Sequence, residues 1–131
     1  MEAAQRYLEA KERYPVGSED WAKATAQAFN KLQQKDCSEV AKPEWWNDEA
    51  LKELSARVVR AAPNENAALG MRADVLSGIH GGAWEAGPRS AAELKEAAAH
   101  YDRSAVLCSA PVLKVGLSER ADLCRSRAEA T

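Results

Sequence analysis

The sequence has little of what β-sheets are made of, because one phenylalanine occurs in 131 residues and β-branched residues are few. The apolar content of 46% is carried mainly by alanine and leucine, which favour helices over strands. No apolar run approaches the roughly 20 residues that cross a bilayer. The opening MEAAQRYLEAKERY is amphipathic and mixed in charge, so we expect no secretion signal. The composition predicts an all-α, soluble, intracellular protein without direct membrane insertion.

An excess of charge of one sign is lacking as well. The 18 Lys+Arg and 20 Asp+Glu residues are interspersed and leave a net charge of −2. A surface that binds nucleic acid needs an excess of basic side chains to neutralise phosphates. The length is that of one domain. We therefore expect a single domain over residues 1–131 with no nucleic-acid partner.

Cysteine is scarce and irregularly spaced. The three residues Cys37, Cys108 and Cys124 form no Cys-x-x-Cys pair, and no histidine is near enough in sequence to complete a metal site. An antiparallel hairpin would not place Cys108 opposite Cys124. We expect three reduced thiols in a reducing compartment, no metal and no cofactor, with Cys124 as a small core residue.

One stretch of the chain recurs. The residues VVRAAPNENAALGMRADVL, 58–76, align at an offset of 48 with VLCSAPVLKVGLSERADLC, 106–124. In both copies a helix ends at a proline and a tight turn leads to a second helix with one apolar stripe. The repeat predicts helical hairpins. The matched positions are Ala62-Pro63 with Ala110-Pro111, Leu69 with Leu117, and Arg72-Ala73-Asp74 with Arg120-Ala121-Asp122.

Apolar residues recur at helical spacing wherever the pattern is regular, and turn residues separate the helices. Ser18, Asn47 and Ser90 are placed to cap helices, and Glu93 completes a capping box with Ser90. The glycine-rich and proline-rich segment 79–90 predicts an inserted loop that the neighbouring helices do not need. The predicted hairpins, about six helices in all, are residues 3–35, 47–77 and 90–128.

Ala97, Tyr101 and Ala105 resemble the tetratricopeptide repeat (TPR), whose second helix carries small, aromatic and small residues before a closing proline. The run APN at 62–64 resembles that closing proline. The family repeat is about 34 residues, so the offset of 48 leaves room for the 79–90 loop. The resemblance implies antiparallel hairpins stacked as a short right-handed TPR-like solenoid, with the first helix of each hairpin lining a concave face.

Two departures from the family pattern concern charge. Arg72 and Arg120 stand where the family carries apolar residues. Each either lies at the edge of the apolar stripe or pairs with a carboxylate across the hairpin, and we expect the edge. The basic and asparagine residues with which some co-chaperones of this family bind a terminal carboxylate are not recognisable. Asp74, Asp122 and Glu119 stand nearer those places, which disfavours that class of ligand.

No constellation of residues predicts catalysis. The run HGG at 80–82 resembles the oxyanion loop of esterases, but the sequence has no Gly-x-Ser-x-Gly elbow to supply a nucleophile. His100 follows alanines that offer no carboxylate, so we expect it on a solvent-facing flank. Glu93, Glu96 and Asp102 are expected to form a solvated helix face. We therefore expect no catalytic, cofactor-binding or metal-binding residues.

Five residues are candidates for contact with a partner: Trp84, Asp74, Asp122, Trp45 and Trp46. Trp84 lies in the glycine-rich loop, where it either folds back to fill a gap between hairpins or anchors a partner. Adjacent tryptophans point about 100° apart on a helix, so Trp45 and Trp46 are not expected to be buried by one neighbour. Asp74 and Asp122 occupy matching positions in the two copies.

Helical solenoids of this size bind extended or helical peptides, or dock into larger assemblies, and they rarely catalyse. The leading hypothesis is a protein–protein interaction module or adaptor that binds a partner protein or peptide and takes part in a larger complex. One alternative is a fixed structural subunit or fragment of a larger multi-protein assembly. The other alternative is an enzyme.

Overall fold

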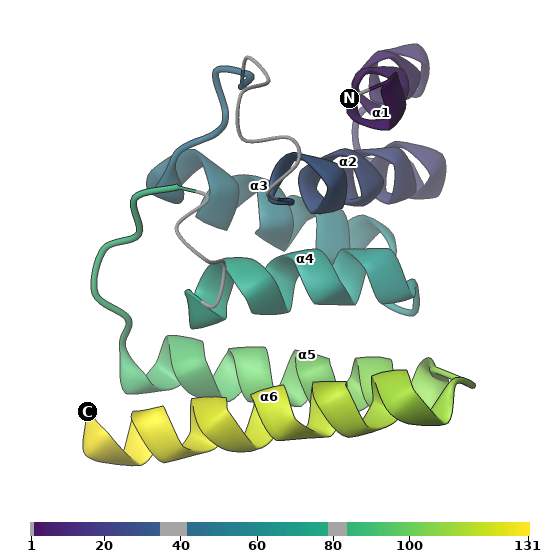
Figure 1. Cartoon of the computed structure of the whole chain (residues 1–131). Coiled ribbons are helices and arrows are strands. Elements are labelled where there is room, and N and C mark those ends of the chain that lie inside the picture. The colour runs from purple at the N-terminus through teal and green to yellow at the C-terminus, as the bar shows by residue number, and fades with distance from the viewer. Residues whose placement is uncertain (1, 35–41, 79–83) are drawn as a thin grey trace.

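The chain is described by a computed structural model over residues 2–34, 42–78 and 84–131. These residues form six α-helices and no strand, which confirms the all-α prediction (Figure 1). No helix among them is long and apolar enough to span a membrane. The helices are α1 (Glu2–Arg13), α2 (Glu19–Leu32), α3 (Asp48–Ala61), α4 (Asn66–Ser77), α5 (Ala91–Leu107) and α6 (Pro111–Ala130).

The helix boundaries follow from caps that the sequence already shows. The Ser18 hydroxyl and the Asn47 side-chain oxygen each accept a backbone N–H in the first turn of the helix that follows. Ser90 and Glu93 form the predicted capping box. Gly78 ends α4 in the left-handed conformation, with φ of 72°, which glycine adopts at little cost. The predicted caps are therefore confirmed.

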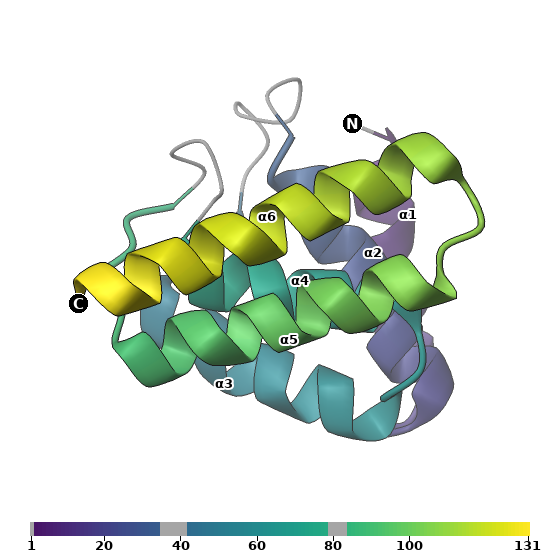
Figure 2. The same cartoon turned by 90° about the horizontal axis from the view of Figure 1, so that it is seen from below.

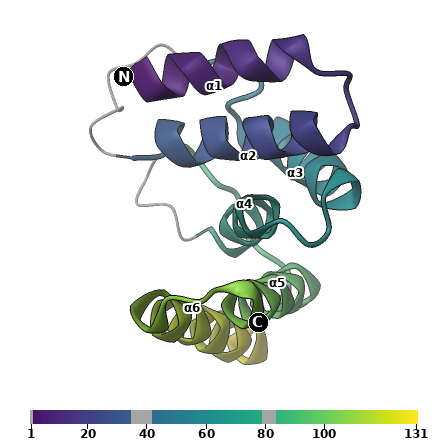
Figure 3. The same cartoon turned by 90° about the vertical axis from the view of Figure 1, so that its right-hand side faces the viewer.

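The helices pack mainly on their neighbours in the chain, with the most extensive packing between α5 and α6. The helices α4 and α6 both pack on α5, and they run in the same direction (Figure 1). The pair α1 and α2 runs across this direction, as Figures 2 and 3 show from two sides. In Figure 3, α2 lies above α4 and α6 lies below it.

Two groups of buried residues hold these helices together. The first, which we call the aromatic core, contains Phe29 and Trp84 with the partly buried Trp46 packed against them. Its ring centroids lie 5.4 to 5.8 Å apart, and Trp84 is in edge-to-face contact with both Phe29 and Trp46. The second, which we call the small-residue core, joins α4, α5 and α6. Its members are Ala73, Leu76, Ala97, Ala98, Tyr101, Ala121 and Cys124.

The repeat predicted part of the small-residue core. Ala73 and its counterpart Ala121 are both fully buried, and Cys124 is buried as its counterpart Leu76 is. Cys124 is a free thiol, and burial raises its pKa. The prediction that Cys124 is a small core residue is confirmed, whereas Cys37 lies outside the described residues.

The end of the predicted inserted loop, residues 84–90, packs on the neighbouring helices through Trp84 and Arg89. Trp84 is only 7% exposed and belongs to the aromatic core. Arg89, near the end of the same segment, reaches back to α3 and α4. Residues 84–90 are therefore tied to the rest of the protein, and Trp84 folds back into the core, which is one of its two predicted placements. Residues 79–83 lie outside the described part of the chain.

A candidate binding groove between three helices

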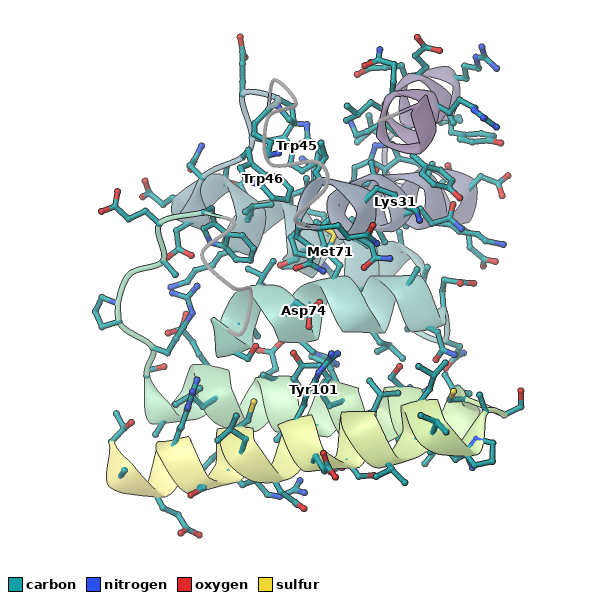
Figure 4. The ribbon with its side chains drawn as sticks, in the orientation of Figure 1. Lys31, Trp45, Trp46, Met71, Asp74 and Tyr101 are labelled. Atoms are coloured by element: carbon teal, nitrogen blue, oxygen red, sulfur yellow. The ribbon has the colours of Figure 1, made fainter. Side chains whose placement is uncertain are left out.

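A groove with a volume of about 400 Å³ opens between α2, α4 and α6, with α5 beneath it. Figure 4 shows Met71, Asp74 and Tyr101 one below another on this side of the molecule. The α2 wall carries three amides, Gln27, Asn30 and Gln33, together with Ala26 and Phe29. The other lining residues are Asn66, Ala67, Gly70, Met71 and Asp74 on α4, Val112, Leu113, Gly116, Leu117 and Arg120 on α6, and Tyr101, Ser104 and Cys108 from α5 and its end.

The lining of α4 and of α6 follows the same spacing. Residues four apart lie on one face of a helix, and each helix contributes such a row to the groove. The α4 row is Asn66, Gly70 and Asp74, and the α6 row is Val112, Gly116 and Arg120. Each row therefore has a glycine in its middle and a charged residue at its end.

Neither the backbone conformation nor the neighbouring residues require glycine at positions 70 and 116. Neither has a positive φ, and a Cβ added to Gly70 or Gly116 would meet nothing within 4 Å. Glycine in a helix interior is about 1 kcal/mol less favourable than alanine. Helix propensity is therefore lowered at both positions, and both positions leave open space in the groove. Glycine is typical of positions where another backbone or a ligand approaches closely.

The bottom of the groove is polar and well ordered by hydrogen bonds. The Tyr101 hydroxyl donates to Asp74 at 2.6 Å and lies 3.2 Å from the Ser77 hydroxyl. Gln33 donates to the second oxygen of Asp74 at 3.0 Å. Burial raises the pKa of Tyr101, and the neighbouring Asp74 carboxylate raises it further. The hydroxyl therefore stays protonated and fixes Asp74 between α2 and α5.

The rim of the groove on the α6 side is apolar and open to solvent. Val112 is 83% and Leu113 is 61% exposed. Arg120, at the far end of the row, is exposed and has no ion-pair partner among the described residues. The groove thus combines an apolar wall, an amide wall and two opposite charges, Asp74 and Arg120, at one end.

Arg72 lies outside the groove and differs from the prediction. Its guanidinium pairs with Glu96 at 2.9 Å and donates to the Lys52 carbonyl oxygen and the Ser55 hydroxyl. The expectation of an arginine at the edge of the apolar stripe is wrong for Arg72, and pairing with a carboxylate is what occurs. The physical reason is that α5 brings Glu96 beside α4, which the spacing within α4 alone does not reveal.

The acidic face predicted on α5 is in fact bound to other side chains. Glu93 pairs with Lys52 at 2.8 Å, and Asp102 pairs with Arg125 at 2.7 Å. Burial raises the pKa of Glu93, but hydrogen bonds from Lys52 and the Ser90 backbone outweigh it and lower the pKa overall. The side chains of Glu96 and Asp102 remain 44% and 48% exposed, so this face is solvated as predicted. The counter-charges that α3 and α6 supply are what the sequence did not show.

His100 also differs from its prediction. Its ring Nε2 lies 3.0 Å from a carboxylate oxygen of Glu96, one turn earlier on α5. Glu96 in turn binds Arg72. This carboxylate stands four residues before the histidine, which places it on the same helix face. His80 lies outside the described residues.

A second polar cluster, which we call the clasp, is built from Asp48, Trp84 and Arg89. Arg89 binds both oxygens of Asp48, at 2.5 and 3.0 Å, and donates to the Val75 carbonyl oxygen at 2.8 Å. The Trp84 indole donates to Asp48 at 3.1 Å. The hydrogen bonds from Arg89, with those from Trp84 and Gly87, hold the pKa of Asp48 well below its usual range. The clasp joins the start of α3, the end of α4 and the segment between α4 and α5.

The structure separates the five predicted partner-contact residues into three places. Asp74 lines the groove. Trp45, Trp46 and Trp84 lie together in and beside the aromatic core, where Trp45 and Trp46 are both half-buried and in contact with each other. Asp122 is exposed on α6 and pairs with Arg125 at 2.5 Å.

Sequence reasoning missed most of the groove. It assigned the concave face to the first helix of each hairpin, whereas the groove is lined mainly by the second helices α2, α4 and α6. Gly70 and Gly116 were the available signal, because glycine is unusual inside a helix. Their meaning depends on the open space around them, which the sequence does not show.

Among the described ranges, no group of three or more His, Cys, Asp or Glu side chains could hold a metal ion. No family model, no curated protein and no solved structure matches the chain. The geometry of the groove is therefore the strongest indication of function that the chain offers.

Proposed function

We propose that the protein is an interaction module that binds a segment of a partner protein in the groove between α2, α4 and α6. The observation that carries the proposal is the pair of glycines in the groove walls. Gly70 and Gly116 reduce helix propensity and leave open space that no described side chain fills. Mostly apolar clefts with a few placed polar groups are typical of binding sites.

The proposed architecture is a short TPR-like stack over α3 to α6. The recurrence at an offset of 48 and the common direction of α4 and α6 support it. The pair α1 and α2 runs across α4, α5 and α6 (Figures 2 and 3), so the proposed stack begins at α3. The proposed role is binding, without catalysis, as an adaptor.

The proposal is tested by filling the groove without disturbing the fold. Gly70→Phe places a ring in space that is open around the added Cβ. Ala99→Phe is the matched control, because Ala99 is exposed on α5 and does not line the groove. Both variants and the wild type are immobilised and exposed to lysate of cells that express the protein, and retained proteins are quantified by mass spectrometry.

We expect a set of proteins that the wild type and Ala99→Phe retain and that Gly70→Phe loses. Circular dichroism establishes that both variants keep the helical content of the wild type. Equal retention by all three folded proteins would exclude the groove as the binding site. Gly116→Phe, on the opposite wall, provides an independent repeat of the test.

The alternative of a fixed structural subunit has one observation in its favour. Val106 and Leu107, adjacent at the end of α5, are 77% and 44% exposed and do not line the groove, and exposed apolar residues that gather on a surface are typical of an interface. In that case Val106→Ser combined with Leu107→Ser abolishes partner retention, whereas Gly70→Phe leaves it unchanged. The same retention experiment therefore distinguishes the two functions.

A further inference from the structure

We infer that the segment bound in the groove is an amphipathic α-helix with an acidic residue that pairs with Arg120. The inference rests on the proposed function, because it specifies what the groove binds. It follows from the chemistry of the two walls, from the spacing of the lining residues and from the charge at the end of the groove.

The two walls call for an occupant with one apolar and one polar face. The α6 wall presents Val112, Leu113 and Leu117, whereas the α2 wall presents the amides Gln27, Asn30 and Gln33. A segment between these walls buries apolar side chains against α6 and polar side chains against α2. Apolar residues at positions i, i+3, i+4 and i+7 of a helix produce this division.

Backbone hydrogen bonding favours a helix over an extended segment. An extended segment exposes N–H and C=O groups on both sides, and such groups must find partners when they are buried. The amides of α2 could bind one side, but along the α6 wall Val112, Leu113 and Leu117 offer nothing to the other, and the one polar side chain is Arg120 at its end. A helix satisfies its own backbone groups internally. A helix can therefore enter this groove without losing hydrogen bonds.

The groove also has the dimensions of a short helix contact. The α4 row from Asn66 to Asp74 covers nine residues, and the eight rises between them amount to about 12 Å, or roughly two helical turns. Rows of residues four apart form the ridges and grooves by which helices pack. Gly70 and Gly116 lie in the middle of their rows. They let the backbone of an incoming helix approach both α4 and α6.

The charges at the far end select an acidic residue. Asp74 is already bound by Tyr101 and Gln33. Arg120 lines the same end of the groove, is exposed and pairs with no carboxylate among the described residues. A partner carboxylate gains an ion pair with Arg120, and complementary charge of this kind sets orientation and specificity.

The inference is tested with two displayed peptide libraries selected on the whole protein. One library is an alanine-based helix randomised at i, i+3, i+4 and i+7, with Glu, Lys or Ala at one further position beyond either end. The other carries the same randomised residues between prolines, which hold the peptide extended. Selected peptides are measured for affinity to the wild type, Gly70→Phe, Ala99→Phe and Arg120→Glu.

We expect binders from the helical library that lose affinity with Gly70→Phe, keep it with Ala99→Phe and carry Glu at one end. With Arg120→Glu, affinity of these peptides falls about tenfold or more, and the matching Lys peptides gain affinity. Gly70-dependent binders from the proline library alone would overturn the helix while the proposed function stands. Helical binders without preference for Glu would overturn the role of Arg120. Absence of Gly70-dependent binders from both libraries would overturn the proposed function itself.

Discussion

The aromatic core and the small-residue core hold the chain together in different ways. Around Trp84, large rings pack edge to face and the clasp fixes Asp48 and Arg89 between three segments. Around Ala121, alanines and Cys124 let α4, α5 and α6 approach closely, with Tyr101 as the one large ring. Large rings contribute stability through buried area, whereas small residues permit close helix packing. We therefore expect most of the stability to lie on the aromatic side, while the groove lies between the two cores and is lined by Phe29 of the aromatic core and Tyr101 of the small-residue core.

Trp84→Ala is expected to have the largest effect. It removes a ring that contacts Phe29 and Trp46. It also removes the indole N–H that donates a hydrogen bond to Asp48. Replacing a buried tryptophan by alanine costs about 3–5 kcal/mol. Urea unfolding followed by circular dichroism measures the loss.

Trp84→Phe is the control, because it keeps most of the ring packing and loses the indole N–H. We expect it to recover more than half of the loss. A Trp84→Ala protein as stable as the wild type, with reduced partner binding, would instead restore the interpretation of Trp84 as a partner anchor.

Arg89→Ala is expected to have the next largest effect. It removes the two hydrogen bonds that Arg89 donates to the Asp48 carboxylate. It also removes the hydrogen bond that Arg89 donates to the Val75 carbonyl oxygen. Breaking a fully buried ion pair costs about 3–5 kcal/mol. Because the Asp48 side chain is 20% exposed, we expect Arg89→Ala to lower the free energy of unfolding by about 2–3 kcal/mol. The free energy of unfolding at neutral pH measures it.

The pH dependence isolates the clasp. The folded-state pKa of Asp48 lies below its usual value of 3.8, so its contribution is present above that value and is lost as pH falls further. We expect the wild type to lose stability from about pH 5 downward, and Arg89→Ala to lose markedly less over the same range. Parallel acid profiles for the two proteins would contradict an Arg89-stabilised carboxylate.

Tyr101→Phe tests the bottom of the groove, with a smaller expected effect. It keeps the ring in the small-residue core and removes the hydroxyl that donates to Asp74. Loss of a hydrogen bond to a charged group costs about 1.5–3 kcal/mol. Because Asp74 keeps Gln33 as a donor, we expect a loss of stability at the lower end of this range. Thermal unfolding measures the change. A neutral result would show that the hydrogen bond from Tyr101 contributes little to the folded state.

Gly70→Ala and Gly116→Ala are expected to have the smallest effect on stability, and with opposite sign. Each adds a methyl group into open space and raises helix propensity, which stabilises by about 0.5–1 kcal/mol. Chemical denaturation of the two variants measures the gain. A loss of stability in either would mean that the fold itself requires the glycine, and its presence would no longer point to a bound partner.

The sequence predicts local features better than it predicts the site. Caps at Ser18, Asn47 and Ser90 depend on neighbours a few residues away, and the repeat identified Ala121 and Cys124 as core. The pairing of Arg72 with Glu96 depends on where α5 lies, which no spacing within one helix encodes. The groove needs three helices that are distant in the sequence, so its residues could not be assembled from patterns along the chain.

The most direct test of the groove uses NMR of the ¹⁵N-labelled protein titrated with a peptide selected from the helical library. The backbone amides of Gly70 and Gly116 report on the groove, and the Trp84 indole N–H reports on the clasp. We expect the two glycine signals to shift on binding and the Trp84 indole signal to stay in place. A shift of the Trp84 indole with unchanged glycine signals would place the partner at the aromatic core and contradict the groove as the binding site.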